Sequence, residues 1–393
     1  MSESSTTTTD LAKPKESTVV YGLSSEGFQI GSKLAAKGYQ VTMIDELLGT
    51  AMELRPEIAG DYRDLRSLLA DEPLMEIRSK KESISGAKVI FFTPRLRRKD
   101  EEILAEVKSR IADSTKNMGP GTVFVFCLPL GIGGTKEIIE RIEHSSGLAN
   151  GSEFWFSYCP LDAEGRPSVY GCDGKDPPYS KVIEAAGLST EIMNLLKAEL
   201  VHAQKTVAKY SSLASAFETA RRLTQMGTES PREYKQVFAE DLSANLFDLN
   251  LVLESLETGE PILYLASGAN KSIESYGRFL VERVREFVRL KDLKAARLKI
   301  ILFSDTDTLE MRGDRLRLAT DLVERLRDYF SDIDSMNVMK EGFNFPMGLD
   351  KTNLLVFMSG SAELKLMQLY EEQIEMTRSH MIRANLPVEF AAK

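Results

Sequence analysis

Residues 18–46 read T-V-V-Y-G-L-S-S-E-G-F-Q-I-G-S-K-L-A-A-K-G-Y-Q-V-T-M-I-D-E, and this stretch decides the fold. A β-branched run suits a buried parallel strand, and the turn that follows contains glycine. A helical pattern then ends at Gly38, and a second strand pattern leads to an acid. The order strand, turn, helix, strand, acid predicts the first βαβ unit of a dinucleotide-binding domain.

In such a unit the diphosphate lies at the helix N-terminus, and the acid accepts hydrogen bonds from a ribose. We therefore predict four cofactor-binding positions here: Gly22, Ser24, Gly27 and Asp45. NAD is predicted rather than NADP, because Asp45 would repel a 2′-phosphate. The usual G-x-G-x-x-G is altered, since Ser24 replaces the second glycine and Glu26 adds a negative charge. The alternative is a βαβ unit that keeps its shape and has lost its ligand.

The α/β pattern continues to about residue 185. Strand and helix patterns alternate, with strands at 85–94, 119–129 and 154–160 and helices at 100–117 and 135–144. Strands separated by helices predict a parallel sheet, with the strand at 154–160 as the last of this domain. Ligands of such sheets bind beyond the carboxyl ends of strands, so Thr93 and Pro94 join the predicted cofactor site. We expect helices over 46–84 and a loop over 161–180.

The second half of the chain begins with helical patterns and returns to α/β. Helices are predicted at 189–227, 231–256 and 270–290, followed by a strand at 298–308, a helix at 312–330, a strand at 353–359 and a helix at 361–383. The predicted fold class is α/β, with two Rossmann-like layers and an all-helical middle. Its parts are a disordered tail at 1–16, a dinucleotide-binding domain at 17–185, a central helical region at 186–296 and a smaller α/β domain at 297–393.

Composition excludes several classes of protein. The 393 residues are 42% apolar and 28% charged, which is ordinary for a globular protein. A net charge of −9 argues against broad electrostatic binding to nucleic acid or anionic lipid. A run of about 18 apolar residues, as a membrane span requires, does not occur.

The cysteines and histidines indicate the compartment and the kinds of metal site to expect. Cys127, Cys159 and Cys172 form no paired framework, which favours a reducing cytoplasm. The N-terminus also lacks the basic and apolar regions of a signal peptide. Three scattered histidines make a histidine-based metal site unexpected, so no metal is predicted.

The layout and several strings resemble the UDP-glucose/GDP-mannose dehydrogenase family, the nucleotide-sugar dehydrogenases, from about Thr18 to about Leu366. The strings are the G-x-S-x-x-G turn with its helix, F-F-T-P at 91–94, the approach to C-P at 145–160, V-A-K-Y-S-S-L-A-S-A-F at 207–217 and K-I-I-L-F-S-D-T-D-T-L-E-M-R at 299–312. The resemblance implies NAD as cofactor, a nucleotide sugar as ligand and a homodimer formed through the central helix. It also implies nucleotide-sugar contacts at Asp305, Asp307 and Arg312, and a general base or oxyanion stabiliser at Lys209.

The chain departs from that family where the chemistry is done. Members oxidise a sugar 6-hydroxyl twice, and the second step needs a thiolate in a G-G-x-C-x-P-K-D loop that this chain lacks. Leu161 stands where the family has a glutamate, and Leu213 stands where it has an asparagine. The lysine of the C-terminal F-K-P-D-T-D motif is missing from F-S-D-T-D. Cys127 and Cys159 follow predicted strands and are the available thiols, although buried packing is the commoner role of a free cysteine.

These departures leave three readings. The first is a divergent NAD-binding oxidoreductase that performs a simpler two-electron step. The second is a non-catalytic scaffold or regulator that binds a nucleotide or nucleotide sugar. The third is a more distant dehydrogenase with a Rossmann domain followed by long dimerising helices, which the C-terminal α/β pattern disfavours.

Overall fold

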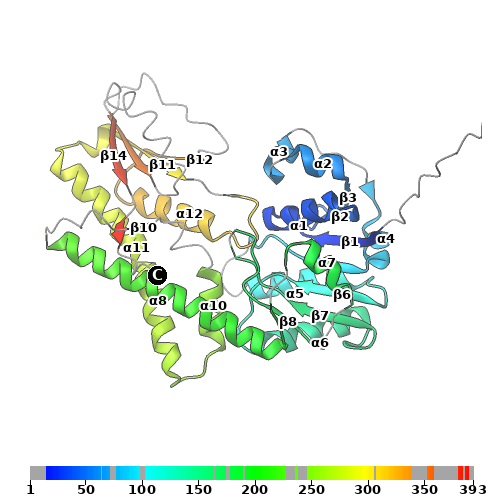
Figure 1. The fold of residues 1–393 in the computed structure, drawn as a ribbon. Helices are drawn as coiled ribbons and strands as arrows, with labels where there is room; N and C mark the ends of the chain where they lie inside the picture. The colour runs from blue at the N-terminus through cyan, green and yellow to red at the C-terminus, as the bar shows by residue number, and fades with distance from the viewer. Residues whose placement is uncertain are drawn as a thin grey trace, which may run out of the picture. The chain divides into compact units, whose positions relative to one another are not determined.

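A computed structural model describes residues 15–62, 64–70, 77–97, 102–162, 164–173, 178–188, 191–226, 235–237, 246–304, 307–337, 352–357, 379–383 and 386–388. The predicted tail lies outside these residues up to position 14, and the first strand begins at Lys15. The chain divides into two compact units, which Figure 1 shows in chain colours. Unit 1 comprises residues 1–128 and 137–195, and unit 2 comprises residues 129–136 and 196–393.

Unit 1 is built on a sheet whose nine described strands run in the order β4-β3-β2-β1-β5-β6-β7-β8-β9. These strands are β1 (Lys15–Tyr21), β2 (Tyr39–Asp45), β3 (Thr50–Leu54), β4 (Ile77–Arg78), β5 (Val89–Phe92), β6 (Thr122–Phe126), β7 (Phe154–Tyr158), β8 (Tyr170–Cys172) and β9 (Ile192–Met193). The five central strands β2, β1, β5, β6 and β7 are mutually parallel. This confirms the predicted Rossmann-like sheet.

The helices of unit 1 alternate with these strands. They are α1 (Ser25–Ala36), α2 (Pro56–Asp61), α3 (Leu65–Ala70), α4 (Lys80–Gly86), α5 (Glu102–Thr115), α6 (Gly134–Ser146) and α7 (Ser180–Ala185). The first turn of α6 is grouped with unit 2. Gly38 has φ +79°, the left-handed conformation that glycine adopts after a helix end, as predicted.

Helices cover both faces of the central strands. Gly31 of α1 faces the side chains of Val41 and Met43, and Met43 is in register with Val20. Neighbouring residues of a strand point to opposite faces, so Tyr21 points away from α1. The Tyr21 hydroxyl donates to the Asp113 carboxylate of α5. Helices α1 and α5 therefore lie on opposite sides of the sheet.

Two sequence predictions in unit 1 need correction. The segment 46–84 was expected to be helical, and α2, α3 and the start of α4 lie within it, but so do β3 and β4, which pair antiparallel to their neighbours. A tight turn at Gly49, with φ +68°, folds the chain back along β2, and this pairing overrides the helical composition. The strand at 154–160 is not the last, because β8 pairs antiparallel with β7 within the expected loop 161–180.

Unit 2 combines long helices with a smaller sheet. Its elements are α8 (Leu195–Gln225), β10 (Lys235–Val237), α10 (Leu246–Ser255), α11 (Pro261–Leu290), a 3₁₀ turn (Ala295–Arg297), β11 (Leu298–Ser304), α12 (Asp314–Arg327), β12 (Ile333–Asn337), β13 (Thr352–Phe357), β14 (Ser379–Arg383) and β15 (Leu386–Val388). The parallel sheet has the order β12-β11-β13-β14. This is the second, smaller parallel layer that the sequence predicts.

Two helices predicted in unit 2 need correction. Part of the segment 231–256 is strand β10, which pairs antiparallel with β15. The end of the segment 361–383 is strand β14, which completes one edge of the parallel sheet beside β13. Residues 358–378 of that predicted helix lie outside the described residues. In both cases pairing with a strand distant in the sequence overrides the local pattern.

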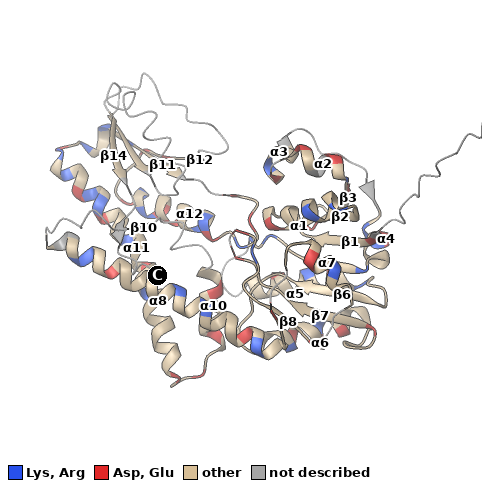
Figure 2. Cartoon of the chain, viewed as in Figure 1, with Lys and Arg blue, Asp and Glu red and all other residues tan. Residues whose placement is uncertain are grey.

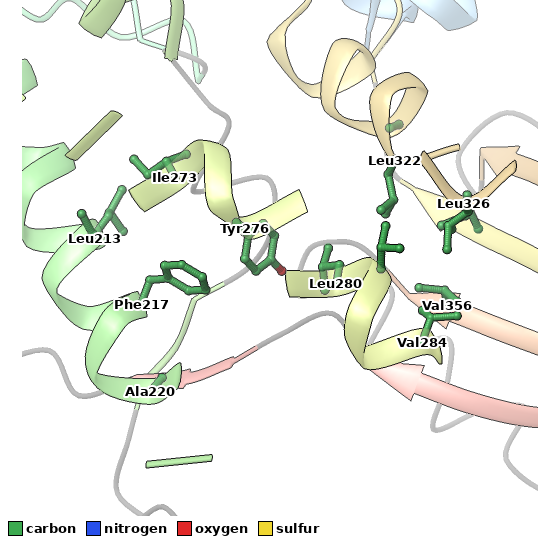
Figure 3. Close-up of a cluster of buried hydrophobic side chains, with 14 of the residues drawn as sticks. Leu213, Phe217, Ala220, Ile273, Tyr276, Leu280, Val284, Leu322, Leu326 and Val356 are labelled. Carbon is green, nitrogen blue, oxygen red and sulfur yellow. The ribbon is translucent and has the colours of Figure 1, made fainter. Parts of the chain in front are cut away.

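One hydrophobic core joins the helices and the sheet of unit 2. Figure 3 shows Phe217 of α8 facing Tyr276 of α11, with Leu322 of α12 and Val356 of β13 in the same cluster. The Phe217 and Tyr276 rings meet edge-on, with centroids 5.4 Å apart. The predicted boundary near residue 296 therefore falls within a shared core.

The surface mixes charges of both signs. Figure 2 shows acidic and basic residues interspersed along α11 and α12. Among the described residues, no helix is long and apolar enough to cross a membrane. The same part of the chain holds no group of three or more His, Cys, Asp or Glu that could hold a metal ion.

Candidate functional site

The turn between β1 and α1 packs directly against the end of β5. Gly22 has φ +123°, and a Cβ atom there would lie 2.1 Å from the carbonyl oxygen of Thr93. A Cβ atom on Gly27 would lie 2.5 Å from the Thr93 hydroxyl. Both glycines are therefore required for the backbone to pass so closely. The structure brings Gly22, Gly27, Thr93 and Pro94 together, as the sequence predicts for neighbouring strand ends.

Ser24 caps helix α1. Its hydroxyl accepts a hydrogen bond from the Gly27 N–H at 3.1 Å, and its φ and ψ of −108° and 160° are those of an N-cap residue. The side chain is buried. The serine that replaces glycine in the fingerprint thus satisfies one of the amides that a bound diphosphate would otherwise face.

Glu46 supplies an anion to the same turn. Its Oε2 accepts the Leu23 N–H at 2.8 Å, and its Oε1 accepts the backbone N–H of Arg95 at 3.0 Å. The Arg95 Nε also donates to Oε1, at 3.1 Å. The Glu46 side chain is fully buried, and the Arg95 side chain is 10% exposed. Two backbone amides and a guanidinium group therefore form an anion-binding cradle that the chain fills itself.

Sequence reasoning missed Glu46 and Arg95. The available signal was the pair of consecutive acids at the end of β2 together with an arginine just after Thr93-Pro94. Arg110 of α5 also donates to the backbone carbonyl of Glu46. Glu46 is therefore held by its main chain as well as by its side chain.

Asp45 shapes the turn that follows β2. Its Oδ1 accepts the amides of Leu47 at 2.8 Å and Leu48 at 3.1 Å, and the Arg95 Nη2 lies 3.4 Å away. An aspartate that accepts amides two and three residues on stabilises a tight turn. The acid predicted to bind a ribose is thus engaged in the β2–β3 hairpin.

The thiols lie inside unit 1. Cys127, Cys159 and Cys172 are all free and buried. Burial raises the pKa of the Cys127 thiol, and nearby Cys159 and Glu26 raise it further. Burial also raises the pKa of the Cys159 thiol. These two groups are protonated at neutral pH, and a protonated thiol is a poor nucleophile.

A second cradle of amides lies at the start of α6. Glu199 of α8 accepts the Gly133 N–H at 2.9 Å and the Thr135 N–H at 2.7 Å, and it is buried. A Cβ atom on Gly131 would lie 2.7 Å from the carbonyl oxygen of Leu251. The segment 129–136 is thus packed on α10 and bound by α8, all within unit 2.

No protein-family model matches this chain, and neither does any curated protein sequence. Solved structures do. The UDP-D-ManNAc dehydrogenase of Pyrococcus horikoshii aligns with a TM-score of 0.60 and 16% identity over 93% of this chain and 94% of its own. The UDP-glucose dehydrogenase of Pyrobaculum islandicum aligns with a TM-score of 0.58 and 15% identity over 90% of this chain and 92% of its own. The NDP-N-acetyl-D-galactosaminuronic acid dehydrogenase of Methanosarcina mazei aligns with a TM-score of 0.56 and 14% identity over 93% of this chain and 90% of its own.

The chain has the nucleotide-sugar dehydrogenase fold. The alignments span almost the whole of both chains, so the likeness covers the two α/β layers and the helices between them. Identities this low establish the fold alone. The resemblance found in the sequence strings is thus supported by the architecture.

Arg312 is paired internally within this nucleotide-sugar dehydrogenase fold. Its Nε and Nη2 lie 2.7 and 3.2 Å from the two carboxylate oxygens of Asp248 in α10. Both residues are buried, and His202 Nε2 lies 3.6 Å from Asp248. Asp307 accepts the Leu309 N–H at 2.8 Å, and Asp305 lies outside the described residues. The predicted nucleotide-sugar role of these three positions stays a prediction.

The remaining positions suggested by the nucleotide-sugar dehydrogenase resemblance do not carry reactive groups in a buried site. Lys209 is exposed on α8, with its Nζ 5.8 Å from the centroid of the Tyr210 ring. Leu161 and Leu213 are buried apolar residues. Lys209 has an exposed side chain with an aromatic neighbour, and its predicted catalytic role stays a prediction.

Proposed function

We propose that the protein is a non-catalytic scaffold built on the nucleotide-sugar dehydrogenase fold. The observation that carries this proposal is the state of the thiols. The resemblance implies an oxidation whose second step forms a thiohemiacetal on a cysteine thiolate. All three cysteines are buried, and the pKa values of Cys127 and Cys159 are raised. The burial of these thiols supports a scaffold that does not perform that step.

The acid–base groups point the same way. A general base needs hydrogen-bond reach to its substrate and a pKa suited to its task. Leu161 and Leu213 carry no such group, and Lys209 projects from an exposed face of α8. Arg312, whose charge the resemblance assigns to a nucleotide sugar, is neutralised by Asp248. A nucleotide sugar that binds to this scaffold therefore has to do so without a free Arg312 charge.

The scaffold is proposed to be a homodimer formed through α8. Leu196 and Leu200, one helical turn apart on this helix, are 59% and 48% exposed. Exposed leucines on a long helix are suited to pairing with a second copy. A reducing cytoplasm is the compartment that suits three free cysteines.

A second candidate is an NAD-linked oxidoreductase that performs one two-electron step. The retained β1–α1–β2 unit, with Asp45 at the end of β2, favours it. This candidate requires a dinucleotide to displace contacts that the chain now makes with itself at Leu23 and Arg95.

Turnover assays separate the two candidates. Purified full-length protein is incubated with NAD and a panel of UDP- and GDP-sugars, and NADH is followed by its absorbance. The scaffold gives no NADH above the rate of a heat-denatured sample. Steady NADH production with any sugar, lost on omission of that sugar, would reject the scaffold in favour of the oxidoreductase.

A further inference from the structure

The turn between β1 and α1 is where a Rossmann-like domain receives the diphosphate of its dinucleotide. Two properties make this possible in such folds: backbone N–H groups that face the ligand, and a surrounding field that favours negative charge. Whether NAD fits this chain can therefore be judged from the partners of those N–H groups and from the charges beside them.

The amides of this turn are engaged by the chain itself. The Leu23 N–H donates to Glu46 Oε2 at 2.8 Å, and the Gly27 N–H donates to the Ser24 hydroxyl at 3.1 Å. Both acceptors are buried, so water does not compete with either contact. A diphosphate would have to replace these two acceptors, and the buried carboxylate would then need a new partner.

The guanidinium group beside the turn is engaged as well. Arg95 gives its backbone N–H and its Nε to Glu46 Oε1, and its Nη2 lies 3.4 Å from Asp45 Oδ1. A diphosphate approaching this arginine would meet two carboxylates that already neutralise it. Repulsion between like charges in a buried site opposes binding strongly.

Glu26 adds a third carboxylate to the neighbourhood. It lies in the first turn of α1 and is only 3% exposed. Its charge reaches Cys127 at the end of β6, because it contributes to the raised pKa of that thiol. Three carboxylates, those of Glu26, Asp45 and Glu46, thus lie near the carboxyl ends of β1, β5 and β6, where the fold ordinarily receives an anion.

We infer that Glu46 is an internal substitute for the dinucleotide diphosphate and that the wild-type chain excludes NAD. The carboxylate occupies the cradle formed by the Leu23 amide, the Arg95 amide and the Arg95 guanidinium group. This inference rests on the proposed function, because it explains how a Rossmann-like unit keeps its shape without a cofactor. The bound anion comes from within the chain, and its effective concentration does not fall on dilution.

The test compares NADH binding by the wild type and by three variants of the full-length chain, using NADH fluorescence and calorimetry. Glu46→Ala removes the carboxylate, and Glu46→Gln removes its charge while leaving an oxygen for the Leu23 N–H. Glu57→Ala is the matched control, since Glu57 is an exposed acid of the same unit on α2. Circular dichroism and thermal melts establish that each variant is folded.

The wild type and Glu57→Ala are expected to give no saturable NADH binding. Glu46→Ala is expected to bind NADH more tightly than the wild type by at least about tenfold, with Glu46→Gln in between. Adding Arg95→Gln to Glu46→Ala should abolish the gain. Equal NADH affinity in the wild type and a folded Glu46→Ala protein, or no gain in either folded Glu46 variant, would overturn the inference.

Hydrogen exchange of the Leu23 amide tests the inference on the wild type alone. The amide should exchange slowly, because its acceptor is a buried carboxylate, and added NADH should not change its rate. Exchange as fast as that of an amide in the denatured chain would overturn the inference, even if both variants failed to fold. Sugar-dependent NADH production by the wild type would reject the proposed function together with the inference, whereas NADH binding without turnover would reject the inference alone, so the two failures are distinguishable.

Discussion

Glu46 and Arg95 hold each other through two hydrogen bonds to one oxygen: Oε1 of Glu46 accepts the backbone N–H of Arg95 at 3.0 Å and its Nε at 3.1 Å. One residue follows β2 and the other follows β5, so the pair ties together strand ends on either side of β1. This contact therefore stabilises the carboxyl ends of the central strands, besides opposing the binding of a ligand there.

Arg95→Gln should therefore destabilise unit 1. Removing one partner of a buried ion pair leaves the other charge uncompensated, which typically costs about 3–5 kcal/mol. The backbone amides of residues 23 and 95 still donate to Glu46, so we expect the lower end of that range, measured by chemical denaturation. Lys81→Gln, at an exposed position of α4, is the control and should change stability by less than about 0.5 kcal/mol. If the destabilisation of Glu46→Gln/Arg95→Gln equals the sum of those of Glu46→Gln and Arg95→Gln, the two side chains are not coupled.

Asp314 should make the stability of unit 2 depend on pH. Burial raises its pKa from 3.8 to about 7, and its Oδ2 accepts the Phe247 N–H at 3.2 Å. Because the folded pKa exceeds the unfolded one, the stability contribution is fully present below about pH 4 and is lost as pH rises through about 7. Stability attributable to this group should thus fall between pH 5 and pH 8, by about 1 kcal/mol or more.

The measurement is the pH dependence of the unfolding free energy in the wild type and in Asp314→Asn. An asparagine cannot ionise, so the difference between the two curves isolates the aspartate. A difference that stays constant from pH 5 to pH 8 would show that Asp314 does not titrate in this range.

The thiols should be inert in the folded protein. Cys127 and Cys159 combine burial with raised thiol pKa values, and both features slow alkylation. Iodoacetamide at neutral pH should label the native chain at least about a hundredfold more slowly than the chain in guanidinium chloride. Mass spectrometry resolves each cysteine, and rapid native labelling of Cys127 or Cys159 would restore a thiolate as a candidate nucleophile.

Phe217→Ala should destabilise unit 2 by about 3–5 kcal/mol, because it removes a fully packed ring from the shared core. The matched control is Tyr264→Ala on α11, where the aromatic side chain is 69% exposed and substitution should matter little. The middle helices and the sheet share this core, so probes in both should lose structure in one transition. Separate transitions would argue that they fold as distinct domains.

The proposed dimer predicts that Leu196→Glu/Leu200→Glu dissociates it. Two charges at the centre of an apolar contact would be buried without partners. Light scattering at micromolar concentration should give twice the chain mass for the wild type and the single chain mass for the variant. Leu290→Glu, at an exposed leucine on α11, is the control. A monomeric wild type would remove this proposal.

The sequence predicted the parts of the fold that local patterns specify. The β1–α1–β2 unit was predicted from 18–46 because strand periodicity, glycine punctuation and helical periodicity all lie within one short stretch. Strands β10 and β14 were assigned to helices, because their pairing partners are distant segments that a local pattern does not reveal. Strand β3, which lies between β2 and β4, depends instead on a hairpin turn.

The candidate site was harder to predict than the fold. The backbone positions Gly22 and Gly27 could be placed, because close packing against Thr93 leaves room for no side chain. The sequence did not reveal that Glu46 is the acceptor of amides at this site, because Glu46 and Arg95 lie 49 residues apart and no local pattern connects them. A fingerprint predicts where amides will point, whereas their acceptor is decided by tertiary packing.

The path of the chain has a practical consequence. Residues 129–136 belong to unit 2 but interrupt the sequence of unit 1, and two of their amides donate hydrogen bonds to the buried Glu199 carboxylate. A gene truncated to begin at codon 196 would encode every long helix of unit 2 and yet leave that acid without donors. A continuous polypeptide of unit 1, residues 1–195, would carry these eight residues without their partners in α8 and α10, and a continuous polypeptide of unit 2 would need them grafted on.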